Sequence, residues 1–289
     1  MYPANMAGAS GVRVGFVTLP SGVTLRVAEA GPPAAPAVVL LHGWGASLFM
    51  HRFALRDLAS AGLRAIAPDL RGHGLSDKPL APGSYSLDAM LGDLFGLMDA
   101  SGLGRGALVG QSMGGGLALH ATLRAPERVS GLVLINPTNL TRNLPASVAR
   151  SVPRFVVRAL NPILATRRVA RLVLRRVVYE DAALVTERGV DEYWAPTQFP
   201  EFAGALASAI TEFDWSPIPI DRLRSVAGAP TLILGSRDRM IRGAAAVAAQ
   251  LPGWDVVQIR GGHAVNEEHP DAVDPEIVRA VRGTPPVRG

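Results

Sequence analysis

The sequence of 289 residues contains no cysteine. Disulfide bonds, thiolate metal sites and a cysteine nucleophile are therefore excluded. A chain without cysteine fits a reducing compartment, so we expect a cytoplasmic location.

Long apolar runs are also missing. No stretch of about 18 uncharged apolar residues is present, so no membrane-spanning helix is expected. The first residues, Met1 to Met6, lack a basic segment followed by an apolar run, which argues against a secretory signal.

Charged residues are scarce as well. They make up 18% of the chain against 48% hydrophobic residues, a composition typical of a globular protein with a sizeable core. The formal net charge is +5. No nucleic-acid-binding motif accompanies this charge, and we interpret it as arginine-rich residue usage, with no nucleic-acid partner.

Short apolar runs recur along the chain, and helical patterns separate them. Runs of this kind are typical of strands buried on both faces of a sheet. A cap at Ser86 and a spacing of three and four predict a helix that ends at Gly102. Another helix is predicted over residues 113–124, and a last one opens at Asp274 and Pro275. The strands are predicted at residues 12–19, 23–28, 37–41, 63–67, 106–109, 131–135, 231–234 and 256–259.

This alternation predicts an α/β fold, a mostly parallel eight-stranded sheet with helices on both faces and an antiparallel start. Residues 138–215 lack buried-strand signals and are expected to form a helical cap inserted into a core domain of residues 1–137 and 216–289. Residues 138–179 hold nine arginines and no acidic residue. We interpret them as a solvated helix face, while attraction of anionic substrates or a membrane surface stays an alternative.

The strongest chemical signal is the pentapeptide Gly110-Gln111-Ser112-Met113-Gly114. It follows a predicted strand and opens a predicted helix, which is the context that a nucleophile elbow requires. Such a sharp turn needs small neighbours, and it sets the Ser112 hydroxyl at a helix N-terminus, where developing negative charge is favoured. Ser112 is therefore the predicted nucleophile. The alternative is a glycine-rich turn that holds an incidental serine.

The sequence resembles the α/β-hydrolase family over nearly its whole length outside the cap. The resemblance rests on the Ser112 elbow and on four further motifs in the family's order. These are Leu41-His42-Gly43-Trp44-Gly45, the segment from Asp69 to Ser76, Gly235-Ser236-Arg237-Asp238, and Gly262-His263.

A serine hydroxyl needs an adjacent base and an acid that orients the base. His263 is the predicted base because it follows a predicted strand at its carboxyl end, where open α/β sheets place ligand sites. Asp238 is the predicted acid, in the family's order of Ser, Asp and His. The family's alternative acid position carries Asn136, which supplies no charge. By resemblance, the backbone amides of Met113 and Trp44 form the oxyanion hole.

The resemblance implies a carboxylesterase that works through an acyl-enzyme on a small-molecule ester, without metal or other cofactor. Carbon–carbon bond hydrolysis, lactone opening and perhydrolysis by the same triad stay open, as does a hydrolase-like ligand sensor. Family members that open epoxides or remove halides use an aspartate nucleophile, so Ser112 argues against both activities. We expect no stable membrane insertion and a monomer or homodimer. Substrate-binding residues are expected to be Trp44, Gln111, Trp194 and Phe213.

Overall fold

The structure is a computed structural model that describes residues 11–141 and 165–283. Its eight-stranded sheet has the order β1-β2-β4-β3-β5-β6-β7-β8. The strand β2 pairs antiparallel with β1 and β4, and all other pairs are parallel. The predicted α/β class with an antiparallel start is therefore confirmed. The strands are β1 (Val12–Thr18), β2 (Thr24–Ala30), β3 (Ala37–Leu41), β4 (Arg64–Pro68), β5 (Gly106–Gln111), β6 (Val129–Ile135), β7 (Thr231–Gly235) and β8 (Asp255–Ile259).

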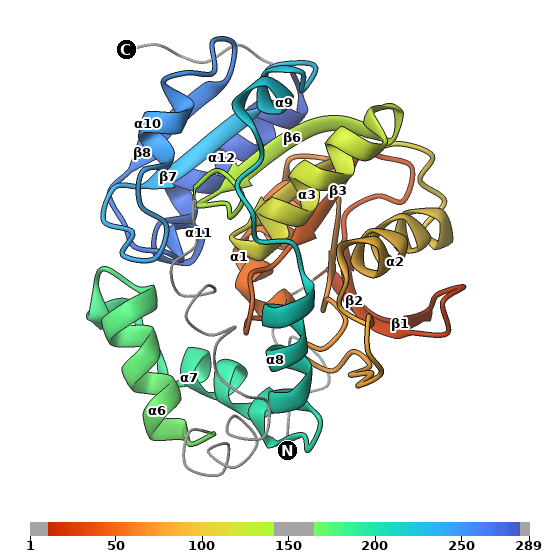
Figure 1. Cartoon of the computed structure of the whole chain (residues 1–289), viewed down its shortest axis with the longest axis vertical. Helices are drawn as coiled ribbons and strands as arrows, with labels where there is room; N and C mark the ends of the chain where they lie inside the picture. The colour runs from red at the N-terminus through yellow and green to blue at the C-terminus, as the bar shows by residue number, and fades with distance from the viewer. Residues whose placement is uncertain (1–10, 142–164, 284–289) are drawn as a thin grey trace.

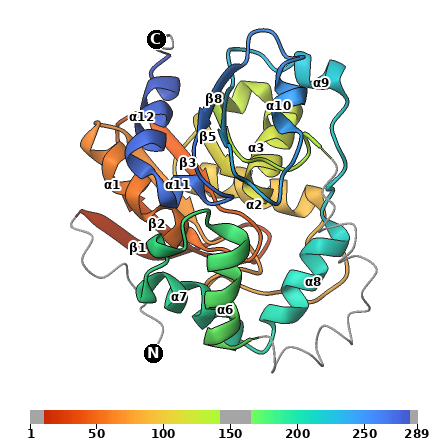
Figure 2. The same ribbon diagram turned by 90° about the vertical axis from the view of Figure 1, so that its left-hand side faces the viewer.

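Helices pack on both faces of the sheet and also form a group beyond one of its ends (Figures 1 and 2). The helices of the sheet layers are η1 (Leu48–His51), α1 (Arg52–Ser60), α2 (Leu87–Ala100), α3 (Met113–Arg124), η2 (Pro126–Arg128), α9 (Ile220–Arg224), α10 (Ala244–Ala248), α11 (Val265–Glu268) and α12 (Pro270–Val281). The predicted Ser86 cap is confirmed, because its side chain accepts a hydrogen bond from the Ala89 amide.

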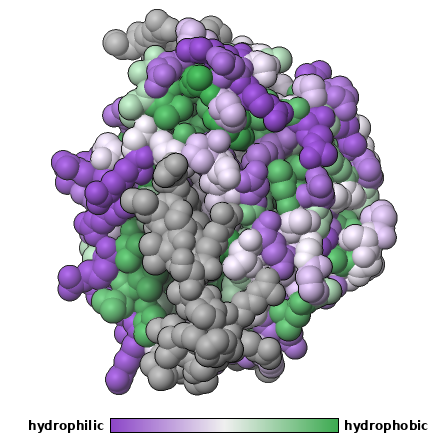
Figure 3. All heavy atoms as spheres, in the orientation of Figure 1, coloured by the Kyte–Doolittle hydropathy of each residue, from purple (hydrophilic) through white to green (hydrophobic). Residues whose placement is uncertain are grey.

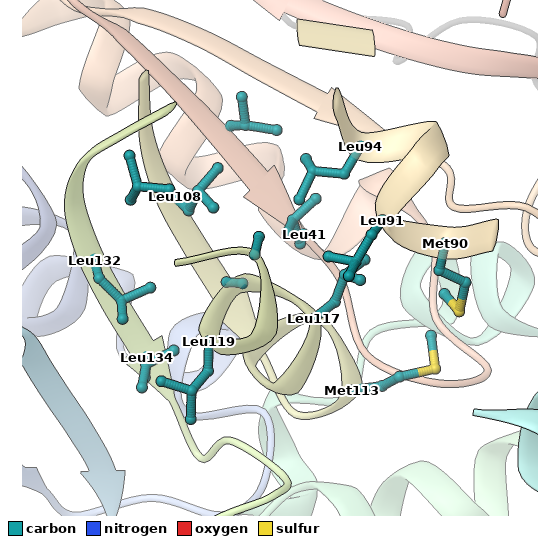
Figure 4. Packing of buried hydrophobic residues seen from close by; sticks show 14 of the residues in the cluster. Leu41, Met90, Leu91, Leu94, Leu108, Met113, Leu117, Leu119, Leu132 and Leu134 are labelled. Atoms are coloured by element: carbon teal, nitrogen blue, oxygen red, sulfur yellow. The ribbon is translucent and has the colours of Figure 1, made fainter. Parts of the chain in front are cut away.

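Alternating side chains of the central strands feed two apolar layers. On β3, Val39 and Leu41 belong to one layer, whereas Val38 and Leu40 belong to the other. The first layer is covered by α2 and α3, whose leucines meet those of β3, β5 and β6 (Figure 4). The second layer is covered by α1 and α12. Burial on both faces explains why these strands read as continuous apolar runs.

The last helix begins earlier than predicted. It starts at Pro270, so Asp274 lies inside α12 instead of capping it. Starting one turn earlier lets Val273 pack into the same apolar layer as Ile277, four residues on. Pro275 then stands in the second turn of α12, where it removes one intrahelical hydrogen bond.

Between β6 and β7 the described residues form helices and turns only. We call residues 165–213 the cap segment. Its helices lie together at one end of the sheet (Figures 1 and 2). The limits 138–215 that we expect for the whole cap stay a prediction, since residues 142–164 lie outside the described part. No described helix has the length and apolarity needed to cross a membrane. The cap segment contains α6 (Arg167–Val173), the π-helix η3 (Leu174–Val178), η4 (Ala182–Leu184), α7 (Glu187–Trp194), η5 (Ala195–Gln198) and α8 (Phe202–Glu212).

Candidate active site

Ser112 stands between the end of β5 and the start of α3 with an unusual backbone conformation. Its φ is 52° and its ψ is −117°, a region that costs a non-glycine residue about 1–3 kcal/mol. The surrounding backbone holds it there. The Ser112 amide donates to the Ile135 carbonyl at 3.0 Å, and its carbonyl accepts from the amides of Gly116 at 3.0 Å and Thr138 at 3.1 Å. The strained turn is thus fixed from β6 as well as from α3.

The glycines beside Ser112 are required by close backbone approach. A Cβ atom on Gly110 would lie 2.3 Å from the Gly114 carbonyl oxygen. A Cβ atom on Gly114 would lie 2.3 Å from the carbonyl oxygen of Leu41 on the neighbouring strand. Backbone atoms cannot move away as a flexible side chain can, so both positions exclude larger residues. The small neighbours of Ser112 therefore follow from the turn itself.

His263 and Asp238 meet at the carboxyl ends of the last strands. His263 Nδ1 lies 2.8 Å from Asp238 Oδ2, and both side chains are almost fully buried. A carboxylate at Nδ1 selects the Nδ1–H tautomer and leaves Nε2 for proton transfer. The other carboxylate oxygen of Asp238 accepts from the amides of Met240 at 2.6 Å and Ile241 at 3.1 Å. Both oxygens of the carboxylate are therefore held in place.

Asn136 ties the loop of His263 to the sheet. Its amide nitrogen donates to the carbonyls of Gly262 at 3.0 Å and His263 at 3.1 Å. Its amide oxygen accepts from the Gly235 amide at 2.8 Å. The side chain of Gln111 adds a further bond to the His263 carbonyl at 2.9 Å. The sequence showed Asn136 only as a residue that cannot carry charge; the signal for its structural role is a polar amide directly after a buried strand.

The cap segment also holds the His263 loop. The Val178 carbonyl accepts from the His263 amide at 2.8 Å. The buried carboxylate of Glu268 accepts from the Gly262 amide at 2.6 Å and from the two amides of residues 180–181 at 2.8 and 3.1 Å. Glu268 is therefore a bridge between the cap segment and the loop that carries His263. The sequence did not predict this role, because Glu268 lies close to His263 along the chain.

A second bridge joins the cap segment to the core through Glu267. Its carboxylate pairs with Arg52 of α1 and accepts a hydrogen bond from the Tyr193 hydroxyl of α7. Burial, followed by the nearby Glu267 charge, raises the pKa of the Tyr193 hydroxyl well above its ordinary value. Tyr193 therefore stays a neutral donor and fixes α7 to the core.

A cavity of about 450 Å³ lies between the sheet edge and the cap segment, and both Ser112 and His263 line it. No hydrogen bond joins these two side chains among the described contacts; such bonds are often loose before substrate binds. No aspartate, glutamate, lysine or arginine of the described residues lines the cavity. Its wall is mostly aliphatic and aromatic, with Val169 and Ile210 among the cap residues and Met50 and Met240 among the core residues.

Two of the four predicted substrate-binding residues, Trp44 and Gln111, line this cavity. The other two, Trp194 and Phe213, are not part of its described lining, and their role in substrate binding stays a prediction. The Trp194 indole donates to the Ala165 carbonyl within the cap segment. Phe213 is fully buried and packs edge-to-face against Trp215, which does line the cavity. The presence of an aromatic residue in the predicted cap therefore does not show whether it lines the cavity or packs in the protein interior.

Of the two amides predicted to bind an oxyanion, that of Met113 directly follows Ser112. Met113 is the first residue of α3, so its amide has no acceptor within the helix. No backbone hydrogen bond from the Trp44 amide is present among the described residues. The loop of Trp44 is pinned by the buried His42, whose Nδ1 bonds to the Gly43 carbonyl and whose Nε2 accepts from the Leu70 amide at 2.9 Å. Burial lowers the pKa of His42 well below its ordinary value, so the ring stays neutral and structural.

The segment from Asp69 to Ser76 has a similar structural role. The buried Asp69 carboxylate accepts from the amides of Leu48 at 2.7 Å and Leu75 at 2.8 Å, and it pairs with Arg26. None of these residues lines the described wall of the cavity. This segment therefore fastens loops together at a distance from Ser112.

Comparison with known proteins gives the family of the chain. A family model described as alpha/beta hydrolase fold matches residues 36–270. Epoxide hydrolase 2 of Siraitia grosvenorii is 41% identical over 123 residues, 43% of this chain and 38% of that protein. The matched segments span less than half the length of the curated relatives.

Solved structures agree in fold over almost the whole chain. The enol-lactonase from Burkholderia xenovorans LB400 has a TM-score of 0.73 at 22% identity, and 93% of this chain and 100% of that chain are covered. The 2-hydroxy-6-oxo-6-phenylhexa-2,4-dienoate hydrolase from Rhodococcus sp. strain RHA1 has a TM-score of 0.76 at 24% identity, with 94% and 99% covered. The match of the family model to most of the chain shows that the protein belongs to the α/β-hydrolase family.

Proposed function

We propose that the protein is a serine hydrolase that cleaves carboxylic esters through an acyl-enzyme. The observation that carries this proposal is the hydrogen bond from His263 to Asp238 at the wall of a cavity that also exposes Ser112. A base oriented by a buried carboxylate is what a neutral serine needs to become a nucleophile.

In the proposed reaction Ser112 Oγ attacks the ester carbonyl while His263 Nε2 takes its proton. The negative charge that develops on the carbonyl oxygen is stabilised by the amides of Met113 and Trp44. His263 then gives the proton to the leaving alcohol, and the acyl group stays on Ser112. Water, deprotonated by His263, attacks the acyl-enzyme and releases the acid, which restores the Ser112 hydroxyl.

The cavity wall favours a neutral, apolar acyl group. A dienoate, the substrate class in the name of the Rhodococcus neighbour, carries a carboxylate and would need a cationic partner. The described wall offers no lysine or arginine for this role. An enol-lactone, the substrate class in the name of the Burkholderia neighbour, is itself an ester, so lactone opening is the second candidate. Although several relatives are named epoxide hydrolases, an aspartate nucleophile is absent from position 112.

A substrate panel tests the proposal. We expect turnover of short p-nitrophenyl esters by the wild-type protein, and loss of that turnover in Ser112→Ala. A lactone and a vinylogous diketone in the same panel separate ester cleavage from the alternatives. Ligand-induced thermal stabilisation without turnover of any compound would contradict the proposal and favour a sensor.

A further inference from the structure

Exposed apolar side chains gather around the mouth of the cavity. Trp44 is 41%, Val173 43% and Val177 40% exposed, and all three also line the cavity. Beside them Leu172 is 57% exposed. Large side chains that are both cavity wall and molecular surface must lie at its opening. We call these four residues the apolar rim. Figure 3 shows hydrophobic spheres over α6 with strongly hydrophilic ones next to them.

Arginines without ion-pair partners flank this rim. Arg168, Arg175 and Arg176 are exposed and form no salt bridge with a described residue. Their neighbours Arg167 and Arg171, in contrast, form salt bridges with carboxylates of α7. Residues 142–164 contain no acidic residue that could pair with the three arginines. No carboxylate among residues 11–141 and 165–283 therefore neutralises the positive charge on this side of α6 and η3.

We propose that the apolar rim and these three arginines dock the protein on an anionic lipid surface. An exposed apolar face beside unpaired arginines is the pattern of helices that lie in a membrane interface, where the arginines meet anionic headgroups. The rim surrounds the entrance of an apolar cavity, so an ester that partitions into lipid enters without crossing water. This last step rests on the proposed function, whereas docking itself does not.

Vesicle sedimentation with Ser112→Ala protein tests docking without turnover. We expect binding to vesicles that contain phosphatidylglycerol and at least tenfold weaker binding to pure phosphatidylcholine vesicles. In the same background, the triple variant R168E/R175E/R176E should bind phosphatidylglycerol vesicles at least tenfold more weakly. The control R56E/R124E/R222E changes the net charge equally on α1, α3 and α9 and should retain binding.

The apolar contribution is tested by Leu172→Asp, with Val256→Asp as its control at an exposed position of β8. Only the first should weaken vesicle binding. Absence of binding by the parent protein, or equal loss in both arginine triples, would overturn the proposal. If Leu172→Asp changed the sedimentation coefficient of the protein but not its vesicle binding, the rim would be a contact between two copies, and lipid docking would be wrong.

A kinetic measurement connects docking with substrate. With the Ser112 hydroxyl present, R168E/R175E/R176E should retain turnover of a short soluble ester but lose at least tenfold in turnover of a lipophilic ester held in phosphatidylglycerol vesicles. Vesicle binding without turnover of either ester would contradict the proposed function and leave docking intact.

Discussion

The carboxyl edge of the sheet and the cap segment differ in how strongly they constrain the identity of their residues. At the sheet edge, Ser112, Asp238 and the loop of His263 are each held by at least two hydrogen bonds to neighbouring strands or turns. In the cap segment, the cavity wall consists of single apolar side chains on short helices, and several of them are partly exposed.

Reaction chemistry and substrate choice are therefore encoded at different scales in this molecule. A strained turn leaves local marks in the sequence, such as the glycines at fixed positions beside Ser112. The apolar wall can exchange one aliphatic residue for another with little loss of stability. The two regions meet where Glu268 and Val178 bind the His263 loop.

The largest effect is expected at the sheet edge. Asp238→Asn should lower kcat by about 10³–10⁴-fold, because the amide supports the wrong tautomer of His263. The amide oxygen of the asparagine can still accept from the backbone amides of Met240 and Ile241, so the fold should persist. Circular dichroism and ester kinetics measure the two effects. A decrease below tenfold would show that Asp238 does not orient the base.

A smaller effect is expected at the joint between the two regions. Glu268→Gln should lower kcat by up to about 100-fold, which is the cost of misplacing a catalytic group by about 1 Å. The NH₂ group of the new glutamine would face the backbone amide of Gly262 or the amides of residues 180–181, so that two hydrogen-bond donors would meet. The exposed Glu127→Gln is the matched control. A rise of KM with unchanged kcat would instead assign Glu268 to substrate binding.

A selective effect is expected in the cap segment. Val169→Phe fills part of the cavity, and we expect turnover of long acyl esters to decrease about tenfold, the scale of one or two methylene groups in a pocket. Short esters should be affected about threefold or less on the same scale. Val256→Phe, on the exposed part of β8, serves as the control. Equal losses for all chain lengths would contradict the separation between chemistry and substrate choice.

The substitution Asp274→Asn lies outside the lining of the cavity. We expect it to leave turnover unchanged and to increase stability in a pH-dependent way. Burial, and then the charge of Asp57, raises the pKa of Asp274 to about 8. The folded state therefore binds a proton that the unfolded chain releases near pH 4, and stability is lost as the pH rises from about 4 to 8. Asp274→Asn should match the wild type at pH 4 and exceed it by a few kcal/mol at pH 9.

Urea unfolding at pH 4, 7 and 9 checks this expectation, with Asp88→Asn, whose side chain is 78% exposed, as the control. A gain that is the same at all three pH values would show that Asp274 is not protonated in the folded protein at neutral pH. Unchanged ester turnover would keep this effect apart from the sheet edge.

Much of the fold was predictable because buried strands and helix caps are local patterns. All eight strands, the start of α2 at Ser86 and the limits of α3 follow from such patterns. The start of α12 was missed, since the pattern of Asp274 and Pro275 imitates a helix start and only the packing of Val273 decides otherwise. The sequence did not predict that Trp194 and Phe213 lie outside the described lining of the cavity, nor the roles of Asn136 and Glu268. These placements depend on contacts between segments that are distant in sequence.

The proposed function requires that Ser112 forms a covalent acyl intermediate. Rapid quenching of the reaction with p-nitrophenyl acetate, followed by peptide mass spectrometry, tests it directly. We predict a burst of p-nitrophenol and an acetyl group on the Ser112 hydroxyl, with neither in Ser112→Ala. Turnover without a burst and without an acetylated peptide, or full turnover by Ser112→Ala, would contradict it.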